Sequence, residues 1–410
     1  MNKKVNHFIK ILIFIYFIQK LKIEEEQKKI QKTNHFEVEI NFDNIISSIN
    51  AKDYVNKIIN GIEIFNRTYN ITNGPKLSVV IPIYNKENII KRTIRSIQNQ
   101  NMDNFEIILV NDYSSDNTLS VIKNIQNFDS RIKIIQNKNN MGTLYSRCIG
   151  TLSAKGKYIL PLDNDDMYLY QNAFDDIYNE INNNNLDMIK FNGIEAENIE
   201  GFFNNKIKNV KFAFKKDHNI IINQPNLSYY PTIRLNNEGK NFAVDLFLWL
   251  KCIDSKLYKK VISIYSKERY SIYMTSCEDD IMTFMIFQFA ESFKYINKYC
   301  ILHFDFPGSA NKLISNESRV ISNMHYLDTV CEFSKNTYKG KEIILGIVLN
   351  IMKFSSFINV VNIIKYRKFF NDILNKIYSS KYIIEADKTL IKTKYYKLIH
   401  NSNYFRSFIN

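Results

Sequence analysis

Four short apolar runs between residues 77 and 162 constrain the fold more than any other feature of this sequence. They are rich in β-branched residues, as is typical of strands buried on both faces of a parallel sheet, and they cover residues 77–83, 106–110, 132–135 and 158–162. Helix-favouring stretches separate them, and the first is an amphipathic pattern over residues 87–98. This alternation predicts an α/β fold with a doubly wound, mainly parallel sheet.

Polar side chains follow three of these predicted strands. Tyr84 and Asp112 each come directly after an apolar run, and the fourth run ends in Asp163, Asp165 and Asp166. Ligands of doubly wound sheets bind outside the carboxyl ends of the strands. Three neighbouring carboxylates need a cation to neutralise them, and Mg²⁺ or Mn²⁺ prefers carboxylate and phosphate oxygens. The pattern indicates a metal site for a phosphorylated substrate, with a solvated acidic turn before a helix as the alternative.

Several classes of protein are disfavoured by the motifs that the sequence lacks. It contains no G-x-G-x-x-G of a dinucleotide enzyme and no G-x-x-x-x-G-K-[ST] of a P-loop NTPase. Its five cysteines include no C-x-x-C pair, and its six histidines form no H-E-x-x-H. The net charge of +14 is spread along the chain without a recognisable nucleic-acid module, so it suits phosphorylated donors or anionic surfaces in general.

Four ordered motifs over residues 77–168 resemble the nucleotide-sugar-binding half of a family 2 glycosyltransferase with the GT-A fold. They are V-V-I-P-I-Y-N (79–85), I-L-V-N-D-Y-S-S-D-N-T (108–118), N-x-G (140–142) followed by Arg147 and Gly150, and D-N-D-D (163–166). The resemblance implies a metal-dependent, inverting transfer of a sugar from a nucleoside-diphosphate donor. A UDP-sugar is the favoured donor, and the acceptor would be a hydroxyl of a glycan, a lipid or a protein.

The resemblance also assigns donor-binding roles. Pro82 and Tyr84 would line the base pocket, where Tyr84 can stack on a uracil-like ring. Glu87 follows them, although an acid there could equally begin a helix. Asp112 matches the acid that accepts a hydrogen bond from the pyrimidine N–H. Arg147 is a candidate donor contact, with an exposed helix arginine as the alternative.

Asp163 and Asp165 match the D-x-D pair of the family. One acid would face the ribose or a metal-bound water, and Asp165 would ligate Mn²⁺ or Mg²⁺ together with Asp163. The chain departs from the family where D-D-G-S is usual, because Asn111 and Tyr113 flank Asp112, and Cys148 stands where Asn is common. Tyr113 in place of Gly is expected to affect the base pocket.

A general base is expected in the second half of the chain. Cys277-Glu278-Asp279-Asp280 precedes an apolar stretch that predicts a buried helix, and it resembles the E-D motif that opens a helix in many family members. Asp279 would deprotonate the acceptor hydroxyl with support from Glu278. The alternative is that these acids only interact with the helix dipole.

No Q-x-x-R-W motif and no series of long apolar spans occurs, so a non-processive enzyme is expected. Two other interpretations stay open: a catalytically inactive glycosyltransferase-like protein that binds sugar nucleotides or glycans, and a nucleotidyltransferase. The second lacks the Gly-rich, basic signature expected after the first strand.

The two ends of the chain predict additional segments. Residues 1–22 resemble a signal-anchor or signal, although the apolar part, residues 11–18, is shorter than the roughly 20 residues of a membrane span. A stalk or linker is expected over 23–74, the GT-A catalytic domain over 75–310, and a helical region over 311–410. We therefore expect association with a membrane, of the endomembrane (ER or Golgi) type, with a cytoplasmic protein as the alternative.

Overall fold

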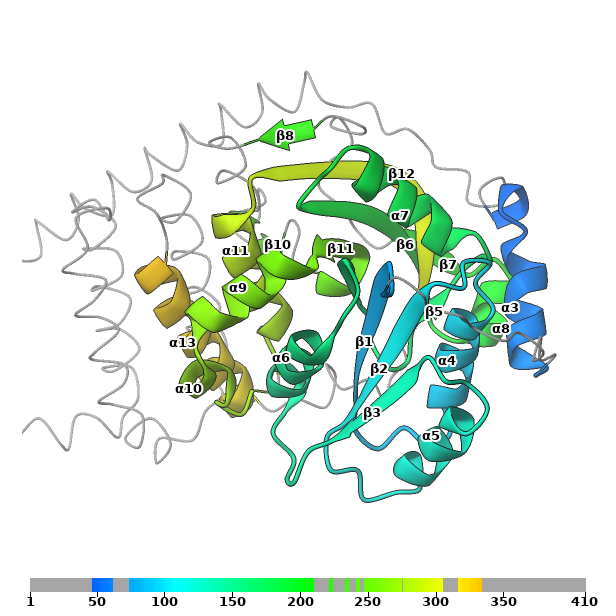
Figure 1. Ribbon diagram of the computed structural model, residues 1–410, viewed down its shortest axis with the longest axis horizontal. Helices are drawn as coiled ribbons and strands as arrows, with labels where there is room; N and C mark the ends of the chain where they lie inside the picture. The colour runs from blue at the N-terminus through cyan, green and yellow to red at the C-terminus, as the bar shows by residue number, and fades with distance from the viewer. Residues whose placement is uncertain are drawn as a thin grey trace, which may run out of the picture.

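The computed structural model describes residues 46–61, 74–209, 221–223, 233–235, 241–243, 247–274, 276–304 and 316–333 (Figure 1). Within these residues the main sheet has ten strands, in the order β3-β2-β1-β4-β11-β6-β12-β5 with β7 beside β6 and β8 beside β12. Helices pack on both faces of the sheet, so the predicted α/β class is confirmed.

The first half of the sheet is parallel. Its strands are β1 (Leu77–Ile83), β2 (Phe105–Asn111), β3 (Ile132–Gln136) and β4 (Tyr158–Pro161). They agree with the four apolar runs to within one or two residues. The helices between them are α4 (Ile90–Gln98), α5 (Thr118–Gln126) and α6 (Thr143–Ser153). Helix α4 begins three residues later than predicted, because residues 87–89 form a turn.

The second half of the sheet is mixed. Strand β11 (Lys251–Asp254) runs antiparallel between β4 and β6 (Met188–Ala196), and β12 (Ser292–Phe304) runs parallel to β6. The short strand β5 (Met167–Tyr168) pairs antiparallel with β12. The remaining short elements are α7 (Ala173–Asn183), α8 (Ile199–Phe203), β7 (Ile207–Asn209), β8 (Ile221–Asn223), and the separate pair β9 (Ile233–Leu235) and β10 (Asn241–Ala243).

Alternate side chains of β1 belong to two different hydrophobic cores. Val79 and Ile81 belong to the core under α4 and α7, whereas Val80 belongs to the core under α6. The second core also contains Leu248 of the 3₁₀ turn η2 (Leu248–Leu250) and residues of four helices: α9 (Ser255–Tyr265), α10 (Lys267–Tyr270), α11 (Glu278–Phe289) and α13 (Asn316–Phe333). These helices lie together to one side of the parallel strands (Figure 1). Helix α11 therefore approaches the sheet on the same face as α6.

Close packing of α6 on the sheet depends on Gly150. A Cβ atom at this position would lie 2.5 Å from Cγ1 of Val80 and 2.9 Å from Cγ2 of Val110. Only a residue without a side chain lets the helix approach β1 and β2 this closely. The approach fixes the position of Arg147, which lies one turn earlier on the same helix.

Helix α3 (Ala51–Ile59) packs against α4. Tyr54, Val55 and Ile58 are buried at helical spacing, and Tyr54 donates a 2.6 Å hydrogen bond to the carbonyl of Ser96 on α4. These residues fall within the range for which the sequence predicts a stalk or linker. Here the chain is instead a packed helix, because its apolar face is buried against α4.

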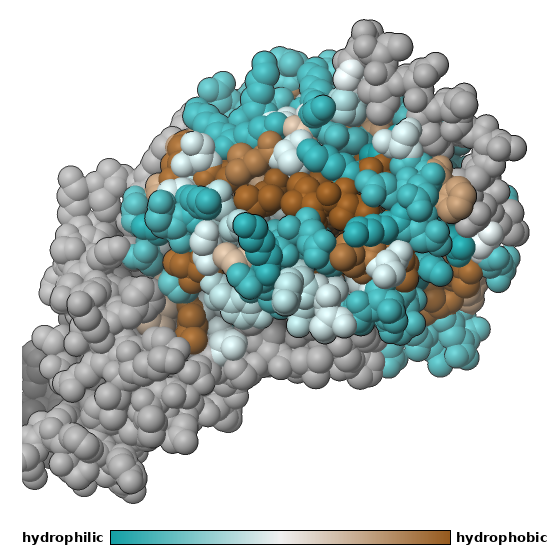
Figure 2. All heavy atoms as spheres, turned by 60° about the horizontal axis from the view of Figure 1, so that its bottom comes forward, coloured by the Kyte–Doolittle hydropathy of each residue, from teal (hydrophilic) through white to brown (hydrophobic). Residues whose placement is uncertain are grey.

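The predicted signal-anchor, residues 1–22, lies outside the described residues. So does most of the predicted C-terminal region, of which α13 is the described part. Among the described residues no helix is long and apolar enough to cross a membrane. Figure 2 shows one face of the molecule, on which hydrophilic side chains surround a band of hydrophobic ones. The expected association with a membrane and the expected cellular location stay predictions.

Candidate active site

The acidic loop that follows β4 is held by neighbours from β1 and α4. The side chain of Asn164 donates a 2.7 Å hydrogen bond to the carbonyl of Pro82, and Oγ1 of Thr93 donates to the carbonyl of Asn164 at 3.0 Å. Arg92 donates to the carbonyl of Asp165 at 3.2 Å. These bonds fix the loop at the carboxyl end of the sheet. Arg92 and Thr93 were missed in the sequence, where they look like ordinary residues of an amphipathic helix.

Each carboxylate of the loop has its own basic partner. Asp163 pairs with Arg147 at 3.0 Å and Asp165 with Lys86 at 2.9 Å, and Asp166 contacts Nδ1 of His303 at 2.8 Å. The Asp166 side chain is fully buried, and only 29% of Asp163 and 16% of Asp165 is exposed. The alternative of a solvated acidic turn is therefore wrong.

His303 is a second residue that the sequence did not reveal. Burial raises the pKa of Asp166 above its usual range. Burial alone would lower the pKa of His303, but the charge and hydrogen bond of Asp166 raise it to about 9. The His303 ring also stacks on Trp249, with ring centroids 4.7 Å apart. No spacing motif connects these residues, because β12 reaches the loop only through the folded sheet.

Arg147 lies at the centre of the site. Its side chain is 2% exposed, and the same nitrogen, Nη2, lies 3.0 Å from Oδ1 of Asp163 and 3.3 Å from Oδ1 of Asp279. Burial alone would lower its pKa, but Asp279 and Asp163 raise it well above the usual value. The alternative of an exposed helix arginine is wrong, while the expected contact with the donor stays a prediction.

The three acids that open α11 are partly buried, and Asp279 is the one that contacts Arg147. Asp279 is 19% exposed, and its Oδ2 accepts a 3.2 Å hydrogen bond from the backbone N–H of Leu248. Burial raises the pKa of Asp279, and Arg147 opposes this rise only in part. Burial and the charge of Asp279 likewise raise the pKa of Glu278. Because Asp279 contacts α6 and η2, it does more than interact with the dipole of its own helix.

Asp112 is buried beneath the loop that contains the N-x-G motif. Its Oδ1 accepts from the side chain of Asn137 and from the backbone N–H of Met141, and its Oδ2 accepts from the backbone N–H of Gly142, all at 2.8 Å. A carboxylate oxygen can accept two hydrogen bonds. Three of its four acceptor positions therefore hold the loop and one on Oδ2 is left, while the expected contact of Asp112 with the pyrimidine of the nucleotide-sugar stays a prediction.

The loops after β1 and β2 contact each other at the edge of this site. Glu87 accepts a 2.8 Å hydrogen bond from the backbone N–H of Asn117, the residue before α5, and does not lie in α4. Tyr84 and Tyr113 are 44% and 55% exposed. Tyr113 has a φ of 61°, a left-handed conformation that explains why glycine would be unstrained there. Its exposed side chain points away from the core.

The loop offers a metal ion two carboxylates. Among the described residues no group of three or more His, Cys, Asp or Glu side chains is arranged to hold a metal. A closed, all-protein metal cage is therefore not formed by these residues. Mg²⁺ typically binds through one or two carboxylates and completes its coordination with substrate phosphates and water. Partly exposed Asp163 and Asp165 fit that arrangement through Oδ2 and Oδ1, because Arg147 and Lys86 each contact the other oxygen of the carboxylate.

An open α/β sheet with acids at the carboxyl ends of β2 and β4, opposed by a further acid on a helix, is the architecture of a GT-A nucleotide-sugar transferase. The comparison with known families agrees, since residues 78–241 match the glycosyl transferase family 2 model. Residues 78–241 are therefore a family 2 glycosyltransferase domain, and this domain makes the chain a glycosyltransferase.

Similar proteins support this assignment. The poly(ribitol-phosphate) β-N-acetylglucosaminyltransferase TarP of Staphylococcus aureus is 29% identical over 270 residues, which cover 65% of this chain and 73% of TarP. An uncharacterised glycosyltransferase of Haemophilus influenzae is 38% identical over 95 residues, 23% of this chain and 29% of the relative. The crystal structure of S. aureus TarS with UDP-GlcNAc shares the fold, with a TM-score of 0.57, 17% identity, and coverage of 80% and 89% of the two chains.

Proposed function

We propose that this enzyme transfers N-acetylglucosamine from UDP-N-acetylglucosamine to a hydroxyl of a glycan or polyol acceptor, with inversion and one sugar at a time. The donor is supported by TarP, whose name describes an N-acetylglucosaminyltransferase, and by TarS, whose structure was determined with UDP-GlcNAc. The TarP name also supports a polyol phosphate as the first acceptor to test. A lipid or protein hydroxyl is the alternative acceptor.

The observation that carries the proposal is the meeting of Asp163 and Asp279 at one nitrogen of Arg147. Asp163 follows β4, where the resemblance locates the donor. Asp279 opens α11, where the resemblance locates the acceptor-side base. A single displacement needs both sites next to each other, because the acceptor oxygen must attack the anomeric carbon directly. The shared guanidinium provides that proximity.

Asp279 is the proposed general base. As the acceptor oxygen bonds to the anomeric carbon and the bond to the UDP oxygen breaks, the hydroxyl proton passes to a carboxylate oxygen of Asp279. A base works best when its pKa lies near the operating pH, and burial moves the pKa of Asp279 upward in that direction. Glu278 would support it by staying protonated beside it, since burial and the charge of Asp279 raise the pKa of Glu278 to about 8, and Arg147 would keep Asp279 ionised.

The donor-binding roles follow from the loops at the sheet edge. Asp112 would accept the uracil N–H on the acceptor position left on its Oδ2, and Tyr84 would stack on the ring beside Pro82. Asp163 and Asp165 would hold Mn²⁺ or Mg²⁺, which supplies positive charge for the leaving diphosphate. Lys86, 2.9 Å from Asp165, would add positive charge at the same place.

The experiment is release of UDP from UDP-N-acetylglucosamine by the purified full chain, with Mn²⁺, with Mg²⁺ and with EDTA, beside other UDP- and GDP-sugars. Asp279→Asn should reduce kcat roughly 100- to 10,000-fold, the usual effect of losing a general base. Asp165→Asn should abolish the metal-stimulated part of the rate. Glu197→Gln, an exposed acid outside the site, is the matched control and should change neither.

Each part of the proposal has its own contradicting result. Release that survives Asp279→Asn assigns the base to another residue, and release unchanged by EDTA excludes the metal. Nucleoside diphosphate release from a different sugar nucleotide, and not from UDP-N-acetylglucosamine, would show that the proposed donor is wrong. Binding of UDP-N-acetylglucosamine without release, across glycan and polyol phosphate acceptors, would instead favour the inactive sugar-nucleotide-binding protein.

A further inference from the structure

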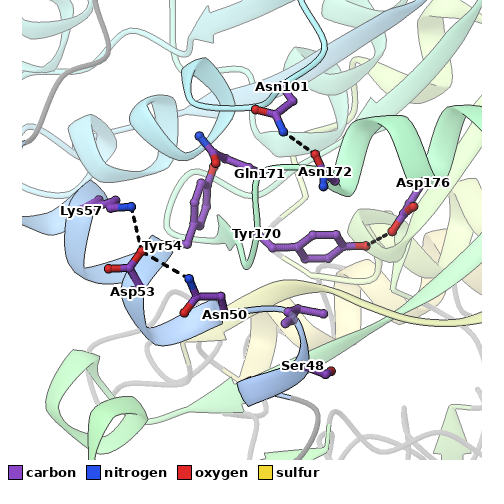
Figure 3. Close-up of a pocket in the computed structure, with 11 residues that line it drawn as sticks. Ser48, Asn50, Asp53, Tyr54, Lys57, Asn101, Tyr170, Gln171, Asn172 and Asp176 are labelled. Atoms are coloured by element: carbon purple, nitrogen blue, oxygen red, sulfur yellow. Dashed lines mark hydrogen bonds and ion pairs between the residues drawn. The ribbon is translucent and has the colours of Figure 1, made fainter.

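A polar cavity of about 410 Å³ lies away from the acidic loop (Figure 3). Residues of α3 and the turn before it form one wall, and Asn101 and the segment 170–172 form the other. Helix α4 separates the two places: its first turn contacts the acidic loop, and Asn101 follows its last turn. At 1.5 Å per residue, the nine residues of α4 span about 13 Å. The volume is in the range of ordinary ligand pockets.

The walls of this cavity are held rigidly by hydrogen bonds from behind. Nε2 of Gln100 donates to the hydroxyl of Tyr54 at 3.0 Å and to the carbonyl of Tyr170 at 2.9 Å, which ties the two walls together. Tyr54 in turn donates to the carbonyl of Ser96 at 2.6 Å. Because Tyr54 and Tyr170 are both buried and anchored, the cavity exists before any ligand binds, which reduces the entropy lost on binding.

Four of the eleven residues that line the cavity carry side-chain amides. Asn50, Asn101, Gln171 and Asn172 come from three different segments and converge on the cavity (Figure 3). Asn101 donates to Asn172, but this bond uses only one polar atom of each. Gln171 makes no side-chain hydrogen bond within the described part of the chain. Amides both donate and accept, as sugar hydroxyls do, so this lining suits a ligand with several hydroxyl groups.

The charges in the cavity compensate one another. Asp53 pairs with Lys57 at 2.8 Å, and Asp176 pairs with Lys298 at 3.0 Å while also accepting a hydrogen bond from Tyr170. A phosphate would meet no uncompensated positive charge here, because Lys57 and Lys298 are both paired with acids. The charge balance therefore selects a neutral ligand.

We propose that this cavity is a second carbohydrate site, which binds an uncharged sugar or polyol unit of the acceptor or product at a distance from the reaction centre. The link to the acceptor rests on the proposed function. A chain held at two places reacts at a raised effective concentration, so this site would lower KM for long acceptors and leave kcat unchanged.

The test is saturation-transfer NMR on the full chain with N-acetylglucosamine and ribitol as separate probes, at about 10 mM because single units bind with Kd values near 1 mM. The double variant Gln171→Ala, Asn172→Ala removes two amides of one wall. It should weaken binding of the probes, measured from the saturation-transfer signal, at least about 10-fold, equivalent to roughly 1.4 kcal/mol. Asn183→Ala, an exposed amide at the far end of α7, is the matched control and should leave the transfer unchanged.

The donor-site variant Asp165→Asn separates this site from the reaction centre. It should lose turnover yet keep the full transfer signal, so failure of the proposed function leaves the cavity result independent. The proposal would be overturned if neither probe gave a saturation-transfer signal. It would also be overturned if the signal survived in the double variant and that variant unfolded at the normal temperature. Transfer lost in Asp165→Asn would assign the signal to the active site and overturn it as well.

Discussion

Replacing Arg147 by methionine removes the cation between the two halves of the site while keeping most of the side chain's volume. Asp163 and Asp279 would then face each other without the guanidinium that now lies 3.0 and 3.3 Å from them. Both carboxylates would be harder to ionise. We expect Asp279 to hold its proton at a higher pH and the rate to fall accordingly.

The size of the effect follows from the geometry. Two unit charges 3.3 Å apart attract by about 5 kcal/mol at an effective dielectric constant of about 20. One pKa unit corresponds to about 1.4 kcal/mol, so the full loss would raise the pKa of Asp279 by roughly three and a half units. Water entering the vacated space weakens this, and we expect a rise of at least about one unit. The substitution also leaves two largely buried carboxylates without their cation, so the free energy of unfolding should fall by about 3–5 kcal/mol.

The assay is UDP release measured across pH. The base must be ionised to act, so kcat/KM should fall as the pH drops through the pKa of Asp279, which burial already holds above the ordinary value of about 3.9. In Arg147→Met this acidic limb should move to higher pH, and Arg147→Lys should restore part of the shift.

Arg269→Met is the matched control for this experiment. Arg269 also contacts two acids, Asp328 and Glu332, but it joins α10 to α13 away from the site. It should lower stability without moving the acidic limb. A limb that stays in place in Arg147→Met, in protein that is still folded, would refute the role of Arg147 in setting the ionisation of Asp279.

Three further predictions concern stability and protonation. Asp129→Ala leaves the fully buried Arg131 without its 2.9 Å partner and should lower the unfolding free energy in urea by about 3–5 kcal/mol; an unchanged midpoint would contradict this. Gly150→Ala should cost about 1–3 kcal/mol, because the added methyl group overlaps side chains of β1 and β2; equal or higher stability would show that α6 can move away. Trp249 is the only tryptophan, and protonated His303, which stacks on it, should quench its fluorescence. Fluorescence emission should therefore rise as the pH increases through the His303 pKa of about 9. This pH dependence should be absent in His303→Gln.

The donor half of the enzyme could be predicted because its signals are local. Strand runs of β-branched residues, the polar residues at their ends and the order of the four motifs all lie within about 90 residues of chain. The four parallel strands appear where these runs predict them, and Asp112 and the acidic loop lie at their carboxyl ends. Such features depend on neighbours in sequence and on the fixed geometry of parallel strands.

The sequence by itself determined the family, the α/β class and the identity of the acids at the strand ends. Tertiary structure alone decided which charges meet: Arg147 between Asp163 and Asp279, and His303 against Asp166 across 137 residues of chain. It also decided that α3 packs on the domain and forms a wall of the polar cavity. These pairings arise when whole elements pack, since the energy of a buried charge depends on every element that excludes water from it and not on the residues beside it in the chain.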